Sequence, residues 1–395
     1  MHIEPFKETI LILIRKDWAN SLFGVLVRIR SDEERKIIVI IRSVGVVIRI
    51  LVRKGNAMIW ERNRIIYIPY SENNKFINGM LANMAAILKR KYVVKESLAE
   101  PVDIFEMLRT KAVILNWVEE RLDGKMKLQL FLHKLFGVRI IWFFHNKMPH
   151  DMAGGHNALD NMLWLSNVSD VICLLSKNSK KHIPDYKKNC RKAVYIPHIM
   201  YKSRIDAIDV DKIRNKYGVS DQDFVFLIFG LIRPYKNIEA GIEAFKELGA
   251  ADAKLMIVGN PVNRRYAKQI RDLCARDHNI ILDMRYIPDE LMDGIIGISD
   301  IVVLPYQDKT SMNSGVMIQA FSNARTVIAP NICMARDFMK EKFLYVYKDD
   351  LGKVIKRAYR RGREENRKMG EQALDYMRLH HCEEKVARKL FAILK

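Results

Sequence analysis

The sequence has 395 residues, which is too long for one ordinary domain and fits two domains of about 150 residues or slightly more. Its 49% hydrophobic and 29% charged residues allow the chain to bury hydrophobic cores, which excludes a disordered or collagen-like protein. The five cysteines are odd in number and form no C-x-x-C pair. This argues against a disulfide framework or a cysteine zinc site and favours a reducing compartment.

The net charge of +21 is concentrated in the first half of the chain. Residues 1–200 hold 33 basic and 19 acidic residues, and so contribute +14 of this charge. A protein this basic attracts phosphate in any form, so nucleic acid, an anionic lipid surface and a lipid diphosphate all fit the composition. Charge alone does not choose among these partners.

Residues 1–61 precede the first strand of the α/β pattern, and three interpretations of them stay open. Their longest apolar stretch, residues 37–52, is interrupted by Arg42 and Arg49, so it is too short for the ~18–20 apolar residues of a membrane span. The segment is an amphipathic membrane-contacting helix, a set of extra strands of the first domain, or an extension upstream of a start at Met58. No signal peptide is evident, and we expect a cytoplasmic protein that lies peripherally on the inner face of the cell membrane.

From residue 64 onward, short apolar runs alternate with longer amphipathic ones. The pattern predicts strands at residues 65–69, 112–116, 138–144 and 171–175, with helices at residues 76–89, 125–135 and 156–165. Such an alternation implies a parallel sheet with helices on both faces.

The same alternation begins again after a polar stretch at residues 201–217. It predicts strands at residues 224–229, 254–258, 280–282 and 301–304, with helices at residues 240–248, 264–277 and 289–297. We therefore expect an α/β fold of two doubly wound domains, residues 62–200 and 201–395, with helices at the end of the second. One large α/β domain with insertions is the alternative.

The loop after the strand at residues 224–229 has the features of a phosphate site. Gly230 lets the backbone come close to a ligand, and Arg233 and Lys236 supply positive charge for a diphosphate. The alternative is a solvated loop that is basic only because the whole protein is basic.

A second loop follows the strand at residues 301–304. There Asn313, Ser314 and Gly315 open an apolar helix, and the free N–H groups and positive dipole of a helix N-terminus favour an anion. Both loops lie at carboxyl ends of strands in the same half of the chain, which is where ligands bind in open α/β sheets.

These two loops belong to a longer series of motifs. In chain order the series is G-x-x-R-P-Y-K-N from Gly230, I-V-G ending at Gly259, Y-I-P from Tyr286, Asp300 through Pro305-Tyr306, the Ser314-Gly315 helix and V-I-A-P ending at Pro330. The series resembles the nucleotide-sugar domain of GT-B glycosyltransferases, most closely glycosyltransferase family 4, also called glycosyl transferases group 1. The resemblance implies two Rossmann-like domains that face a central cleft, with a nucleoside diphosphate sugar bound to the second.

The resemblance also implies which residues contact the donor. They are Gly230, Arg233, Lys236, Tyr286, Ile287, Ser311, Asn313, Ser314, Gly315 and Gln319. Ser311 and Gln319 stand where the family usually has two glutamates, one near the donor sugar and one on the ribose. An amide can still bond a ribose hydroxyl, whereas the carboxylate on the sugar side is missing.

The first half has a narrower likeness. Asn116-Trp117-Val118-Glu119, and the segment from Trp142 through His145-Asn146 to Pro149-His150-Asp151, resemble the W-x-x-H-N-x-x-P-H-E pattern of members that build exopolysaccharides on lipid carriers. Asp151 replaces the usual Glu, and His198 matches an I-P-H motif at the domain junction. By this resemblance the first domain binds the acceptor.

We expect His145, His150 and Asp151 to be catalytic. Imidazole has a pKa near neutrality that suits it to take the acceptor proton, and a neighbouring carboxylate orients the ring or acts as the base itself. The alternative is a structural loop. No metal site is predicted, because Asp209-Val210-Asp211 heads a helix as a cap and His380-His381-Cys382 lies on a helix face without a fourth ligand.

The sequence thus predicts an enzyme that moves a hexose from a nucleoside diphosphate sugar to a glycan or lipid-linked acceptor, without a bound cofactor or metal. Alternatives are a catalytically degenerate relative that only binds, and a basic nucleic-acid-binding protein. Nucleic-acid binding is disfavoured because the basic runs at residues 89–91, 187–188 and 360–363 each have a single adjacent aromatic.

Overall fold

The computed structural model describes residues 62, 64–69, 74, 76, 78–80, 82, 91–94, 104–147, 155–306 and 311–394, and the backbone of four strands between residues 8 and 53. The chain divides into two compact units, Met1–Arg62 and Asn63–Lys395. Within the described residues, no helix combines the length and the apolar character needed to cross a membrane.

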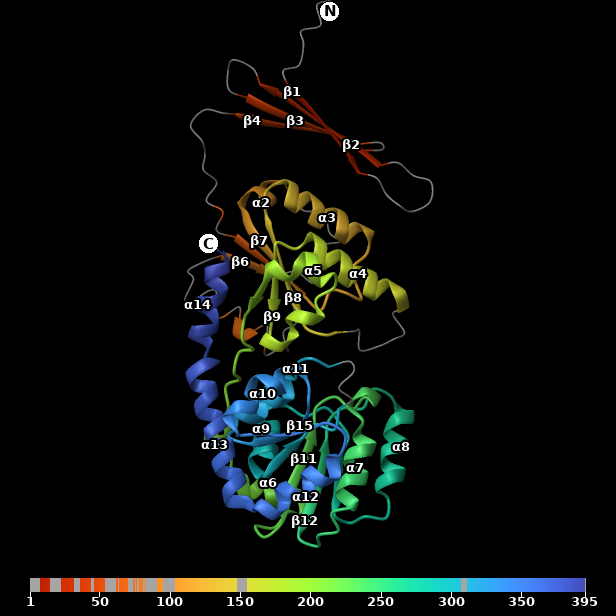
Figure 1. Cartoon of the computed structure of the whole chain (residues 1–395), viewed down its shortest axis with the longest axis vertical. Coiled ribbons are helices and arrows are strands. Elements are labelled where there is room, and N and C mark those ends of the chain that lie inside the picture. Colours follow the sequence, from red (N-terminus) through yellow and green to blue (C-terminus); the bar gives the residue numbers. More distant parts are fainter. Residues whose placement is uncertain are drawn as a thin grey trace, which may run out of the picture. The chain divides into compact units, whose positions relative to one another are not determined.

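The first unit contains one antiparallel sheet. Its strands follow one another in the order β1 (Glu8–Ile14), β2 (Phe23–Ser31), β3 (Lys36–Ser43) and β4 (Val46–Arg53) (Figure 1). The helical interpretation of residues 37–52 is therefore wrong, because this stretch forms the paired strands β3 and β4. Its many Ile and Val residues favour strands, since β-branched side chains fit a pleated sheet better than a helix. The four strands pair with one another and are not part of the first domain's sheet.

The first domain of the second unit is built on a six-stranded parallel sheet. The strand order is β6-β5-β7-β8-β9-β10. The strands are β5 (Arg64–Ile68), β6 (Lys91–Val94), β7 (Thr110–Asn116), β8 (Arg139–Phe144), β9 (Val171–Leu174) and β10 (Ala193–Tyr195), and the helices are α2 (Ile104–Arg109), α3 (Gly124–Leu135), α4 (Gly155–Val168) and α5 (Tyr186–Asn189). The predicted strands at residues 65–69, 112–116, 138–144 and 171–175 are all found within two residues of their predicted bounds.

The second domain is also doubly wound, with the order β13-β12-β11-β14-β15-β16. Its strands are β11 (Phe224–Phe229), β12 (Ala253–Val258), β13 (Ile280–Asp283), β14 (Ile301–Val303), β15 (Thr326–Pro330) and β16 (Tyr345–Tyr347). Its helices are α6 (Val210–Tyr217), α7 (Ile238–Lys246), α8 (Arg264–Cys274), α9 (Asp289–Ile298), α10 (Gly315–Ser322), α11 (Cys333–Phe338), α12 (Leu351–Arg361), α13 (Arg363–His380) and α14 (Glu383–Leu394). The strand order reverses between β11 and β14, and the crevice at the carboxyl ends of these two strands is where such a sheet binds a ligand.

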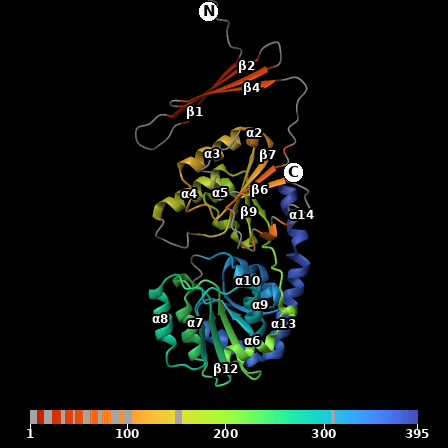
Figure 2. The ribbon, with the colours of Figure 1, turned by 180° about the vertical axis from the view of Figure 1, so that it is seen from behind.

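The end of the chain returns to the first domain. Helix α13 runs along the second domain and α14 lies beside the first, as both views show (Figures 1 and 2). Arg139 on β8 donates a hydrogen bond of 2.7 Å from Nη1 to the carbonyl oxygen of Ile393. The Nζ of Lys389 lies 5.0 Å from the centre of the Tyr195 ring. Helix α14, which belongs to the second domain in sequence, therefore packs against the first domain.

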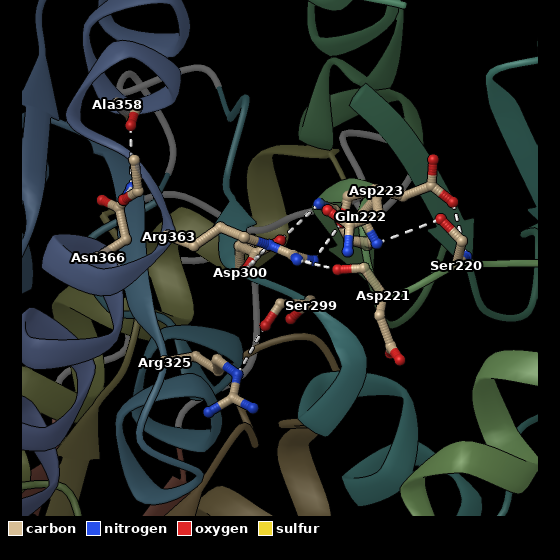
Figure 3. A network of polar contacts seen from close by, with 12 residues as sticks. Ser220, Asp221, Gln222, Asp223, Ser299, Asp300, Arg325, Ala358, Arg363 and Asn366 are labelled. Carbon is tan, nitrogen blue, oxygen red and sulfur yellow. Dashed lines mark hydrogen bonds and ion pairs between the residues drawn. The ribbon is translucent and has the colours of Figure 1, made fainter. Parts of the chain in front are cut away.

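A polar network attaches the start of α13 to the second sheet (Figure 3). Arg363 donates to the Oδ1 of Asp300 at 3.2 Å and to the carbonyl oxygens of Asp221 and Asp223. The other oxygen of Asp300 accepts a bond of 2.7 Å from the backbone N–H of Val225, and burial raises the pKa of this carboxyl. Asp300 precedes β14 and lies at the sheet edge opposite the crevice. Although it belongs to the motif series, this residue stabilises the fold and does not contact a ligand in the crevice.

Candidate active site

A cavity of about 340 Å³ lies between the two domains of the second unit, at the carboxyl ends of their strands. Seven of the predicted residues line it: His145, Gly230, Lys236, Ser311, Asn313, Ser314 and Gly315. The other predicted residues that the structure describes, Arg233, Tyr286, Ile287 and Gln319, do not line it. His150 and Asp151 lie outside the described residues. One face of the cavity therefore carries the loops that follow β11 and β14, which we call the donor loops, and the other face carries His145.

Gly230 stands at the end of β11, beside the point where the strand order reverses. Its φ of +94° lies in the left-handed region, which favours glycine. A Cβ at this position would lie 3.1 Å from the Nζ of Lys236 and 3.5 Å from the Cγ2 of Val316. A side chain here would thus press against the lysine and against α10.

Lys236 is the only lysine of the described residues that lines the cavity, and it is 5% exposed. It ends the 3-10 turn Pro234–Lys236, and its Nζ donates to the carbonyl oxygen of Phe229 at 3.4 Å. The same Nζ lies 5.6 Å from the centre of the Tyr306 ring. Burial, and then the charge of Arg233, lower the pKa of Lys236 to about 7. Because an anion would favour the charged form, this site is adapted to receive negative charge.

The N-terminus of α10 forms the adjoining wall of the cavity. Ser314 caps the helix by accepting a bond of 3.2 Å from the N–H of Met317 at its Oγ. A Cβ on Gly315 would lie 3.1 Å from the hydroxyl oxygen of Tyr201, so a larger residue would require the tyrosine to shift. The positive end of the helix dipole thus faces the same space as Lys236.

Two amide side chains near α10 carry buried atoms that bond to nothing in the described part of the chain. These atoms are the Oδ1 of Asn313 and the Nε2 of Gln319. Buried polar atoms of this kind usually find a partner, so the Oδ1 of Asn313 is available to a bound ligand. Asn313 already lines the cavity, whereas Gln319 lies one turn further along the helix.

His145 follows β8 and is 5% exposed. Its Nε2 lies 3.0 Å from the Oδ1 of Asn116, at the end of β7. Because a carbonyl oxygen only accepts, Nε2 carries the proton, and Nδ1 is the basic nitrogen of the neutral ring. The ring also stacks on Trp117 at a centroid distance of 4.0 Å.

Phe76 is a site residue that the sequence analysis did not single out. Its ring contacts Trp117, His145 and His198, at centroid distances of 5.8, 5.7 and 4.9 Å. It lines the cavity from the segment that follows β5. An isolated phenylalanine in a helical pattern reads as an ordinary core residue, so the sequence carried no signal for it.

The two candidate metal motifs are structural. Asp209 caps α6 by accepting a bond of 3.0 Å from the N–H of Lys212, which confirms the predicted cap. His381 is not on an open helix face but is 3% exposed, and its Nδ1 lies 2.7 Å from the carbonyl oxygen of His198. In the part of the chain that the structure describes, no three His, Cys, Asp or Glu residues come together as metal ligands would.

Comparison with known proteins shows which family the second domain resembles. Residues 209–375 match the family model described as Glycosyl transferases group 1. These residues are therefore similar to a glycosyl transferases group 1 domain. The match extends from α6 into α13 and so contains both donor loops.

Solved structures give the fold of the whole second unit. The HepE protein of Anabaena, crystallised with UDP, has a TM-score of 0.67 at 10% identity, covering 84% of this chain and 99% of that chain. A glycosyltransferase from Rickettsia africae has a TM-score of 0.64 at 15% identity, covering 84% and 97%. The predicted GT-B fold and the predicted resemblance to this group are confirmed.

A curated relative is similar over a shorter stretch. The GDP-mannose:glycolipid 4-beta-D-mannosyltransferase of Xanthomonas campestris pathovar campestris is 36% identical over 104 residues. This alignment covers 26% of the present chain and 29% of the relative. The chain thus spans less than a third of that relative's length.

Proposed function

We propose that the protein is a glycosyltransferase that moves a hexose from a nucleoside diphosphate sugar to a glycan or lipid-linked acceptor. The observation that carries this proposal is the meeting of the buried Lys236 and the N-terminus of α10 in one cavity. A cation and a helix N-terminus stabilise the charge that develops on a leaving diphosphate. The names of the relatives, one with a GDP-mannose donor and one crystallised with UDP, fit the same class of donor.

In this proposal the two faces of the cavity have different tasks. The diphosphate lies between Lys236 and α10, and the acceptor lies against Trp117 on the first domain. An acceptor hydroxyl attacks the anomeric carbon, the bond from this carbon to the phosphate oxygen breaks, and the nucleoside diphosphate leaves with the electron pair. The hydroxyl proton passes to a base, for which the Nδ1 of His145, His150 and Asp151 are the candidates.

The surface of α3 and α4 supports a lipid-linked acceptor. Both helices pack on the same face of the first sheet, since buried residues of each join one core with Val113 and Leu115 of β7. Three leucines on their outer side, Leu128, Leu159 and Leu163, are 55%, 43% and 43% exposed. Exposed apolar groups of this kind mark contact surfaces.

A basic segment lies near the end of α4. Residues 177–192 contain seven lysines and arginines against one acidic residue. Lys192 in this segment donates to the carbonyl oxygens of Ser166 and Asn167 near the end of α4, at 3.0 and 2.8 Å. Exposed leucines and a basic segment on the same domain suit an anionic membrane surface. We therefore propose that the protein acts at the inner face of the cell membrane, where it contributes to the synthesis of an exopolysaccharide.

Donor binding tests the proposal directly. Saturation-transfer NMR with UDP- and GDP-sugars should show contact with the nucleotide. Lys236→Ala should weaken this binding roughly tenfold to a hundredfold, because hydrogen bonds to charged groups contribute ~1.5–3 kcal/mol. Tight binding of RNA with no contact to any nucleotide sugar would instead favour the nucleic-acid-binding alternative.

A further inference from the structure

His198 lies in the segment that joins the two domains, three residues beyond β10. Its ring lines the cavity, although the residue is only 5% exposed. Neither the donor loops nor the proposed acceptor face includes it. The proposed mechanism therefore assigns no role to the polar atoms of this ring.

The proton of the His198 ring is placed by its hydrogen bond. Nδ1 lies 2.8 Å from the carbonyl oxygen of Ile199, and a carbonyl oxygen only accepts, so Nδ1 carries the proton. Burial, and to a lesser degree the nearby His381, lower the pKa of His198 to about 4. The ring is therefore neutral near pH 7, and Nε2 is a hydrogen-bond acceptor.

The position of Nε2 limits which ligand group it meets. It lies 4.0 Å from the point that a Cβ on Gly315 would occupy, at the first residue of α10. A phosphate oxygen and the Nε2 of the neutral ring are both acceptors, so the neutral ring does not bond to phosphate. A hydroxyl group donates, and the hydroxyls nearest to the diphosphate of a nucleotide sugar are those of the transferred sugar.

The ring is held in this position by contacts from both domains. Phe76 of the first domain and Tyr201 lie against it, with centroid distances of 4.9 and 5.5 Å. Its backbone is held by His381, whose Nδ1 bonds the carbonyl oxygen of His198 at 2.7 Å and whose own carbonyl accepts from the N–H of Met200 at 2.9 Å. Such support from neighbouring residues keeps a recognition atom in place before the ligand arrives.

We propose that His198 is a specificity-determining residue that accepts, at Nε2, a hydrogen bond from a hydroxyl group of the transferred sugar. The inference rests on the proposed function. It assigns sugar recognition to a neutral imidazole in a protein that has Ser311 in place of the family's sugar-side glutamate.

Calorimetry on the full chain tests the proposal by comparing a nucleoside diphosphate with its sugar conjugate. His198→Phe removes both ring nitrogens and keeps an aromatic ring, whereas His198→Gln keeps an acceptor near the position of Nε2. His198→Phe should bind UDP or GDP as the wild type does, but should bind the matching nucleotide sugar roughly five- to tenfold more weakly. His198→Gln should recover part of this loss, and the exposed His278→Phe serves as the matched control for a histidine removed elsewhere.

A set of monodeoxy nucleotide sugars identifies the hydroxyl. For one of them, the wild type should lose affinity while His198→Phe should not, since the contact is already absent. If His198→Phe weakens the binding of the diphosphate and of the nucleotide sugar equally, or weakens neither, the inference about His198 is overturned while the proposed function stands. If the wild type binds no nucleoside diphosphate at all, the proposed function fails and this inference fails with it.

Discussion

Asn313 donates a hydrogen bond of 2.7 Å from its Nδ2 to the backbone carbonyl oxygen of His145. The bond joins the loop before α10 to the loop after β8, and so connects the two faces of the cavity. A second connection lies outside the cavity, where Asp337 accepts from the N–H of Lys177 and from the Nδ2 of Asn178, at 2.9 and 2.6 Å.

Asn313→Ala should loosen the contact between the two faces. One neutral hydrogen bond contributes ~1 kcal/mol, so we expect kcat/KM for donor to fall roughly five- to tenfold with little change in melting temperature. Kinetics with the best donor measure the effect. The exposed Asn215→Ala is the matched control, and an unchanged kcat/KM in Asn313→Ala would show that this bond does not contribute to the reaction.

The low pKa of Lys236 predicts a pH-dependent stability difference. A pKa of about 7 in the folded protein lies below the ordinary lysine value, so the unfolded chain binds more protons above pH 7 and the free energy of unfolding rises with pH there. Lys236→Met has no titrating group at this position, so its free energy of unfolding lacks this pH dependence. The variant should therefore exceed the wild type in stability most below pH 7, and the difference should shrink between pH 7 and 10. Urea unfolding at pH 6 and 9 measures it, and an equal gain at both values would refute the assigned pKa.

Removal of divalent metal should leave turnover intact. In the proposed mechanism, the leaving diphosphate is stabilised by Lys236 and by the N-terminus of α10, which line the same cavity. Activity should therefore persist in excess EDTA. A loss that magnesium or manganese restores would mean that a metal supplies this charge instead.

A chain that begins at Met58 should remain folded. It lacks β1 to β4, which pair only with one another in the described sheets, and it keeps every strand of the two α/β domains. Its melting temperature and its affinity for nucleoside diphosphate should match those of the full chain. Insolubility of the shorter chain would show that the first unit contributes to the stability of the second.

Replacing Leu128, Leu159 and Leu163 with serine should weaken sedimentation with anionic liposomes more than tenfold. Burial of a leucine side chain contributes roughly 1.5–3 kcal/mol, so the loss of three such side chains is large even if each is only partly buried. The exposed leucines Leu273 and Leu379, on α8 and α13, provide the matched control.

The chain that begins at Met58 should sediment with anionic liposomes as the full chain does. If that chain is the one that loses binding, the membrane contact lies in residues 1–61.

Local sequence patterns were sufficient for the main strands and for the two donor loops. Strands such as β11 are continuous apolar runs of a length typical of buried strands. Gly230 has a left-handed φ that favours glycine, and Gly315 packs closely against Tyr201. Four strands of the two α/β domains, β6, β10, β15 and β16, were not predicted. Each has at most five residues, which is a short stretch in which to recognise a period. Residues 37–52 form strands and not a helix, because their many β-branched side chains fit a pleated sheet better than a helix.

The sequence by itself determined the two α/β domains and the cationic and helix-end groups of the donor site, because each depends on a pattern within a few neighbouring residues. Tertiary structure alone decided the protonation of these groups and which distant residues support them. The lowered pKa values of Lys236 and His198 arise from burial, which depends on how the domains pack. His198 and His381 meet across 183 positions of sequence because α13 and α14 return along both domains. Periodicity does not encode such contacts, since they depend on the order of strands and on the path of the final helices.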